Sequence, residues 1–291
     1  MIQRQPFEYM VKYTQQKNWI DGRGNFIAFA FFLGGISGGL FMAAAYFDSI
    51  LGMFISFLLA ICMGISYMIH LGQPSQFWRM MSKPGTSWIS RGFIFIMLFI
   101  GLTFITLVLA QWVPDAKSLI VTFKILAGIF AFAQSIYTGF AVSYVSAIKL
   151  WNSGILPILF VVCGFSGGMA ILMGISLGGS EIAAIENVTR ITLIAFAVIL
   201  IVYLWNATYS SAAAKDSVAR MLGGNIAVVF WVGVAVLGVI IPIAVSLITY
   251  WAGEASSALL LAAVVSEILG GLSLRYVILK GGTYIPLTSG E

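Results

Sequence analysis

Three side chains in this sequence, His70, Tyr137 and Glu267, could handle protons from within apolar segments. An imidazole exchanges protons near neutral pH, and a phenol placed in lipid needs a hydrogen-bond partner. A lone carboxyl group in an apolar segment is costly unless it faces protein or a wet cavity. These residue types therefore indicate proton chemistry inside a membrane.

Each of these residues also has a structural interpretation, which the sequence leaves open. His70 could end a helix or pin a loop, Tyr137 could bond to a neighbouring helix, and Glu267 could be a hydrogen-bonded packing residue. Arg275 follows Glu267 by about 12 Å of helix, so we expect no direct ion pair, although both could border one polar crevice. Asn25, in the first turn of the first span, could cap that helix or meet a ligand, and capping is favoured.

The composition requires a lipid environment for these residues. Hydrophobic residues make up 60% of the 291, and charged residues only 9%, against about 25% in an ordinary soluble domain. Such a chain cannot cover a water-exposed surface, which excludes a soluble enzyme and a disordered chain. The net charge of +5 is spread over short loops and forms no basic face, so we expect no nucleic-acid partner.

Metal ligands are scarce. The chain has one histidine, and its two cysteines, Cys62 and Cys163, lie inside apolar runs. It therefore lacks ligands for an iron–sulfur cluster, a structural zinc or a bis-histidine haem. We expect no metal or haem on this chain, so any metal that takes part in redox chemistry must sit on another chain.

Eight apolar runs are long enough to cross a bilayer, which needs about 20 residues each. The fold class is therefore an all-α integral membrane protein with eight transmembrane helices. The first 24 residues have no apolar h-region, so we expect no cleavable signal peptide. Segment 5–19 alternates aromatics with lysines and is expected to be interfacial, and loop 72–89 could hold one short interfacial helix. The expected spans are 24–47, 51–71, 90–112, 119–147, 154–178, 189–211, 225–250 and 257–280.

The basic residues are distributed unequally between the two sides of the bundle. With eight spans both termini share one side, and that side carries twelve Lys and Arg against three on the other. The positive-inside rule then places both termini and the 72–89 loop in the cytoplasm. The twelve are Arg4, Lys12, Lys17, Arg23, Arg79, Lys83, Arg91, Lys149, Lys215, Arg220, Arg275 and Lys280, and the three are Lys117, Lys124 and Arg190.

Glycine clusters punctuate three of the spans, at 33–40, 163–168 and 267–272. Small residues let transmembrane helices approach closely, and we expect tight helix packing to account for most of them. A slot for a flat ring is the alternative.

The motifs resemble those of the NrfD family, typified by the membrane subunit of polysulfide reductase. The strongest matches are HLGQP (70–74), FWR (77–79) and SWISRG (87–92). The family usually has Arg where this chain has Gln73, which removes one cation from the loop. Further matches lie in the family's order over nearly the whole chain: GGISGG (34–39), YTGF (137–140), LWNSGILPILF (150–160), SGG (166–168), and E, GG and LRY at 267, 270–271 and 274–276.

The resemblance implies a single transmembrane domain over 1–291 with two four-helix bundles, at 24–147 and 154–280, after an interfacial segment at 1–23. It implies a menaquinone or ubiquinone site in the first bundle, near the face that meets a four-cluster ferredoxin-like iron–sulfur subunit. A molybdopterin or tungstopterin catalytic subunit often completes such a complex. The chain would then be a quinone-reactive subunit in the cell (inner) membrane, not catalytic for the terminal substrate on its own.

The resemblance also assigns residues. Tyr137 matches the tyrosine of span four that approaches the quinone in relatives, with Gln134 on the same helical stripe and His70 as a proton donor. In span one, Ile27 and Ala30 stand where polar groups were expected, and Asn25 is only nearby. Other roles are expected for five residues: partner docking or loop folding for Arg79, Trp88 and Arg91, and a proton path for Glu267 and Arg275.

Three functions compete: a quinone-reactive anchor subunit, a proton- or ion-translocating subunit, and a passive membrane anchor. The polysulfide reductase arrangement places the catalytic partners outside the cell, whereas the charge count places the histidine loop in the cytoplasm. For this chain the charge count is preferred because its bias is large.

Overall fold

The computed structural model describes residues 14–15, 19–252 and 256–285. Eight helical segments in this part are long and apolar enough to cross a membrane, as the sequence predicted. Seven are single helices and one joins the π-helix η3 to α9. They are α2 (Asn25–Tyr46), α3 (Ile50–His70), α4 (Trp88–Trp112), α5 (Lys117–Ser143), α6 (Ile155–Ile175), α7 (Ile182–Ser210), η3 (Val229–Ile240) with α9 (Ile241–Ala252), and α10 (Ser257–Gly281).

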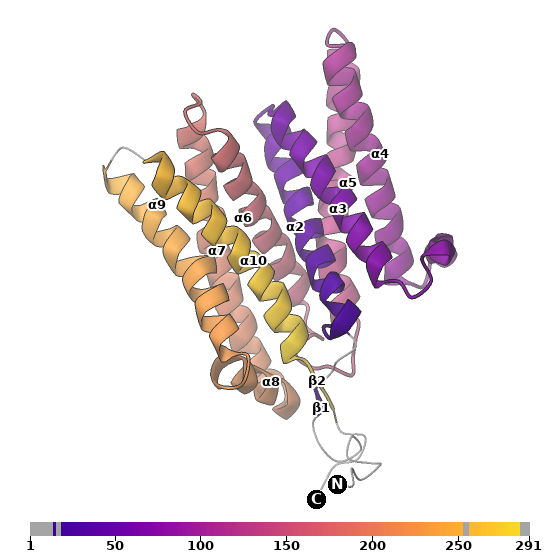
Figure 1. Cartoon of the computed structure of the whole chain (residues 1–291), viewed down its shortest axis with the longest axis vertical. Coiled ribbons are helices and arrows are strands. Elements are labelled where there is room, and N and C mark those ends of the chain that lie inside the picture. The colour runs from indigo at the N-terminus through magenta and orange to yellow at the C-terminus, as the bar shows by residue number, and fades with distance from the viewer. Residues whose placement is uncertain (1–13, 16–18, 253–255, 286–291) are drawn as a thin grey trace, which may run out of the picture.

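The helices run side by side, with α2 and α6 near the middle and α4 and α9 at opposite edges (Figure 1). One end of the bundle carries His70 and the short elements, and we name it the His70 face. The other end carries the α2–α3 turn at Asp48 and is named the Asp48 face. Because the spans alternate in direction, α7 starts at the Asp48 face and α9 ends there.

Helices α2 and α6 are the most buried spans because glycines replace side chains where they meet. A Cβ atom on Gly39 would lie 2.3 Å from the Gly164 carbonyl oxygen, and one on Gly168 would lie 2.2 Å from the Leu40 nitrogen. Only glycine permits such backbone contact. The expectation of tight packing is confirmed for these two clusters, and Gly270 on α10 packs likewise against Gly238 on η3.

The seventh span changes helix type along its length. Its first half is the π-helix η3, and it continues as α9 with Pro242 as the second residue. Proline has no backbone N–H to donate to the preceding turn, and Ser266 on α10 donates a hydrogen bond to the Leu237 carbonyl just before it. A π-helical stretch of this length is unusual, and the sequence analysis did not foresee it.

Short elements gather at the His70 face (Figure 1). The 3-10 helix η2 (Pro74–Met81) lies in loop 72–89, which confirms the expected short helix. Two-residue strands β1 (Thr14–Gln15) and β2 (Thr283–Tyr284) pair antiparallel. Helix α8 (Ala212–Gly223) was not predicted; the short helix η1 (Gly22–Gly24) precedes α2. Most of the predicted interfacial segment at 1–23 lies outside the described residues.

Two predicted span limits were wrong. The fourth span ends at Ser143, before residue 147, because turns follow it. The sixth begins at Ile182, not at 189, so Glu186 and Arg190 belong to the helix and not to a loop. These two side chains pair with each other and with α9, which makes their inclusion in the span possible.

Candidate functional site

Tyr137 lies inside the first group of spans, where α2, α3, α4 and α5 meet. Its side chain is 4% exposed and packs with Ala30, Met63 and Ile96. Gly92 on α4 has no side chain because the Tyr137 ring occupies that position, 2.1 Å from where a Cβ would be. The ring is therefore held in place by one helix from each side.

Tyr67 on α3 is the residue that the sequence analysis missed. Its hydroxyl is buried without a hydrogen-bond partner among the described residues, and its phenol interacts electrostatically with that of Tyr137. Buried polar groups normally have partners, so this hydroxyl is a candidate to bind a ligand. A tyrosine in an apolar run gives no local signal of this kind in the sequence.

His70 is the last residue of α3, one helical turn after Tyr67. Its Nδ1 lies 3.1 Å from the Arg23 carbonyl oxygen. A carbonyl only accepts, so Nδ1 donates and Nε2 is the acceptor of the neutral ring. The histidine thus ties α3 to the start of α2, and Tyr67 brings it into line with Tyr137.

Gln134 is fully buried one turn before Tyr137, in the contact between α5 and α2. Its Nε2 donates to Ser37 Oγ at 2.7 Å and to the Gly34 carbonyl at 3.3 Å. Its Oε1 has no partner among the described residues. Gln134 therefore holds two helices together and keeps one acceptor unused.

Asn25 is the exposed first residue of α2, and the N-cap position is Gly24. Within the described residues its side chain makes no cap hydrogen bond. The favoured interpretation of Asn25 as a helix cap was wrong, because the 3-10 turn η1 runs directly into α2 and shifts the cap by one residue.

Loop 72–89 is organised by the residue pair Trp88 and Arg91. The Arg91 guanidinium donates to the carbonyls of Pro84 (2.8 Å) and Gly85 (2.6 Å) and lies over the Trp88 ring. Trp88 stacks on Phe140 with ring centroids 4.6 Å apart. Arg79 is exposed on η2 and lies over the Trp78 ring.

Glu267 and Arg275 are buried on α10, 5% and 1% exposed. Glu267 accepts a hydrogen bond from Ser166 on α6, while Arg275 Nη2 donates to the Phe160 carbonyl at 2.7 Å and the guanidinium lies over the Phe160 ring. Among the ion pairs of the described residues none joins Glu267 to Arg275. Cys163 interacts electrostatically with both, so the two charges border one small polar region.

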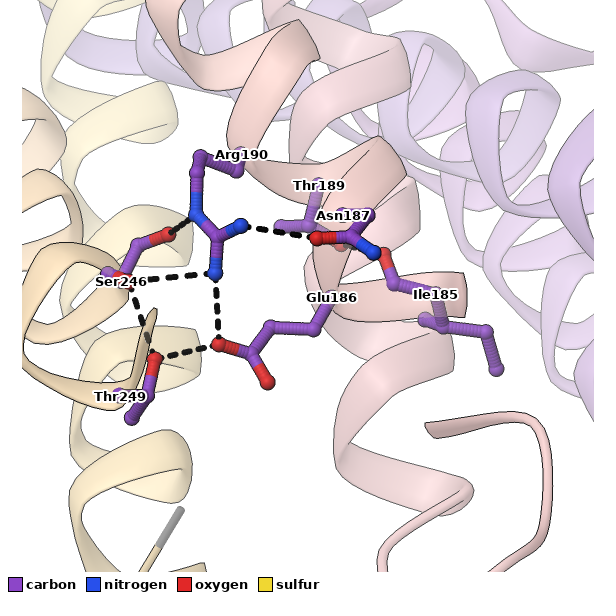
Figure 2. A network of polar contacts seen from close by, with 7 residues as sticks. All are labelled: Ile185, Glu186, Asn187, Thr189, Arg190, Ser246 and Thr249. Atoms are coloured by element: carbon purple, nitrogen blue, oxygen red, sulfur yellow. Dashed lines mark hydrogen bonds and ion pairs between the residues drawn. The ribbon is translucent and has the colours of Figure 1, made fainter. Parts of the chain in front are cut away.

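A second polar group, which the sequence analysis placed in a loop, joins α7 to α9 near the Asp48 face (Figure 2). Arg190 Nη2 donates to Glu186 Oε1 at 3.0 Å, and Arg190 Nε donates to Ser246 Oγ at 2.8 Å. Thr249 donates to the same Glu186 oxygen. The i,i+4 spacing of Glu186 and Arg190 was the available signal.

The described residues contain no group of three or more His, Cys, Asp or Glu side chains that could hold a metal ion. The polar residues at hand are phenols, an imidazole, an amide and carboxyl groups. They can donate and accept hydrogen bonds and transfer protons.

These features define a multi-pass membrane protein with polar sites inside an eight-helix bundle. A family model described as "Polysulphide reductase, NrfD" matches residues 23–286. The chain therefore belongs to the NrfD family.

Three curated relatives support this assignment. A polysulfide reductase chain of Wolinella succinogenes is 30% identical over 56% of this chain and 52% of its own length, so the match spans about half of that relative. Protein NrfD of Escherichia coli is 28% identical over 77% of this chain and 79% of its own. The NrfD homolog of Haemophilus influenzae is 24% identical over 75% and 77%.

Proposed function

We propose that this chain binds menaquinone or ubiquinone in the first four-helix bundle and exchanges electrons and protons between it and an iron–sulfur partner subunit. The observation that carries the proposal is the buried Tyr67 hydroxyl, which has no hydrogen-bond partner among the described residues and faces the phenol of Tyr137. A quinone offers two carbonyl acceptors, which phenols can recognise.

The chain's own residues supply hydrogen bonds and proton transfer. Conversion of a quinone to a quinol takes up two electrons and two protons. Tyr67 and Tyr137 donate hydrogen bonds to a carbonyl, and the His70 ring passes protons between the site and the His70 face. Gln134 supports the site by fixing α5 against α2.

Electrons come from, or go to, a partner chain. The relatives include one chain of a polysulfide reductase, an enzyme whose name thus describes a multi-subunit assembly. The partner expected here is a four-cluster ferredoxin-like subunit with a molybdopterin or tungstopterin catalytic subunit behind it. The docking surface proposed for it is η2 with loop 72–89, where Phe77, Trp78 and Met81 are exposed beside Arg79.

Substitution of the two phenols tests the proposal. In the purified complex, Tyr67→Phe and Tyr137→Phe should lower quinol-linked turnover by about 100-fold, the lower range for loss of a proton-transferring group. Dye-linked activity of the partner should stay unchanged. The matched control is Tyr144→Phe, because Tyr144 ends the same helix and is 72% exposed. Unchanged quinol turnover in both variants would leave the chain a passive anchor.

The orientation proposed for the chain puts the His70 face in the cytoplasm. Ser82 and Ser180 are exposed on loops at the His70 face and the Asp48 face. In a background without Cys62 and Cys163, a membrane-impermeant thiol reagent should label Ser82→Cys only in inside-out vesicles and Ser180→Cys only in right-side-out ones. The reverse pattern would place the docking loop outside the cell.

A further inference from the structure

The Glu186–Arg190 pair belongs to the membrane interior more than to the surface. The two side chains are 15% and 16% exposed. Glu186 lies one turn into α7, about 6 Å from the helix start at the Asp48 face. Arg190 and the hydroxyl of Thr249 both donate to its Oε1, so one oxygen of the carboxylate is fixed (Figure 2).

A narrow cavity runs from this pair to Glu267. Glu186, Arg190 and Glu267 all line it, between α6, α7, α9 and α10. Glu267 lies ten residues into α10, about 15 Å from the Asp48 face. The cavity therefore connects a carboxylate near the face with one near the middle of the span.

The size of the cavity decides what can pass. The space within it for water centres is about 10 Å³, which is room for about one water molecule. A quinone ring or a hydrated metal ion does not fit, and the Arg190 guanidinium repels cations. A proton needs only hydrogen-bonded groups one water apart, which carboxylates, hydroxyls and a water can supply.

The inner end of the cavity is bounded by positive charge. Beyond Glu267 lies Arg275, whose Nε and Nη1 are buried without a partner among the described residues. A fixed guanidinium blocks cations and protons in a narrow path. The polar route is therefore accessible from the Asp48 face and ends at Glu267.

We propose that Glu186, held by Arg190 and Thr249, together with the cavity behind it, forms a proton-access path that connects the Asp48 face with the buried carboxyl group of Glu267. One proton passes from water at that face to Glu186, through a water in the cavity, and to Glu267, and it leaves by the same atoms in reverse. No electron transfer is involved. Arg190 is a positioning residue, since it acts through Glu186.

The test measures exchange of the Glu267 proton for deuterium by infrared spectroscopy of the full chain in liposomes. The carboxyl C=O band that disappears in Glu267→Gln should shift in heavy water. In Glu186→Gln and in Ala263→Leu, which fills the cavity, the shift should be slower by about tenfold or more. Ala263 lines the cavity and carries no polar group. The control is Glu181→Gln, because Glu181 is exposed at the start of the same helix.

Two results would overturn the proposal. One is the absence of any band from pH 4 to 9 that Glu267→Gln removes, which would mean that Glu267 carries no exchangeable proton. The other is exchange in Ala263→Leu and Glu186→Gln as fast as in the unaltered chain. Neither measurement uses quinone or a partner subunit, so failure here leaves the proposed quinone function untouched.

Discussion

A Cβ atom on Gly164 of α6 would lie 2.7 Å from the Cα atom of Gly35 on α2. The two helices thus touch through their backbones, and this contact joins the spans that hold Tyr137 to those that hold Glu267. On its other side Gly35 faces the Arg275 guanidinium, with a built Cβ 3.1 Å from Nη2. The first glycine cluster of the sequence is therefore the joint between two polar regions.

Gly164→Ala should destabilise this joint. The added methyl overlaps the backbone of α2, and overpacking of a tight contact costs about 1–3 kcal/mol. The measurement is the thermal unfolding midpoint of the full chain in detergent. Gly101→Ala is the control because no atom lies within 4 Å of its built Cβ, so that variant should be neutral or slightly more stable. Equal midpoints for the two variants would mean that the helices can separate without loss.

Hydropathy and glycine spacing were enough to predict the eight spans, their order and the close packing of two glycine clusters. These features are local, because each span must satisfy its own backbone in lipid. The Glu186–Arg190 group was missed for the opposite reason. Two charges within five residues look like a loop, and only the partners on α9, about sixty residues away, allow them inside a helix.

The candidate site shows the same division. Tyr137 and His70 could be proposed from motifs, but the position of Tyr67 depends on which phenol on a neighbouring helix it faces. Helix α8 escaped prediction because its twelve residues are too polar for a span and too short to show clear periodicity. The cap at Gly24 depended on a 3-10 turn that no residue pattern marks.

Trp151 anchors the end of α10. Its side chain is fully buried, and its Nε1 donates to the Ile278 carbonyl at 2.8 Å. The last carbonyls of a helix lack intrahelical partners. Trp151→Phe removes the donor and should lower the free energy of unfolding by about 1–3 kcal/mol.

The control for this prediction is Trp205→Phe, since Trp205 is 68% exposed on the lipid-facing side of α7. It should shift the thermal midpoint little. A shift as large as that of Trp151→Phe would show that loss of indole volume, and not of the hydrogen bond, dominates.

Ser37 and Gln134 should be energetically coupled. The Gln134 amide donates to Ser37 Oγ at 2.7 Å across the α2–α5 contact, and both residues are fully buried. In a double-mutant cycle with Ser37→Ala and Gln134→Leu, the interaction energy should be about 0.5–3 kcal/mol. The cycle is measured on unfolding free energies of the four proteins. Strict additivity would show that the hydrogen bond contributes nothing between these helices.

Arg91 should control the order of loop 72–89. Its guanidinium binds two loop carbonyls at once and lies over Trp88, a geometry that lysine cannot reproduce. In Arg91→Lys the charge is kept, yet the amides of Thr86 and Ser87, which bond to the Lys83 carbonyl, should exchange with solvent deuterium several-fold faster. Mass spectrometry of the peptide that covers the loop measures this.

The matched variant is Arg79→Lys, because Arg79 is exposed on η2 and its guanidinium contacts only the Trp78 ring among the interactions found within the described residues. Loop exchange should be unchanged there, whereas binding of the iron–sulfur partner should weaken if η2 is the docking surface. Faster exchange in Arg79→Lys than in Arg91→Lys would reverse the two roles. Arg91 would then be the candidate for docking, and the order of the loop would come from η2.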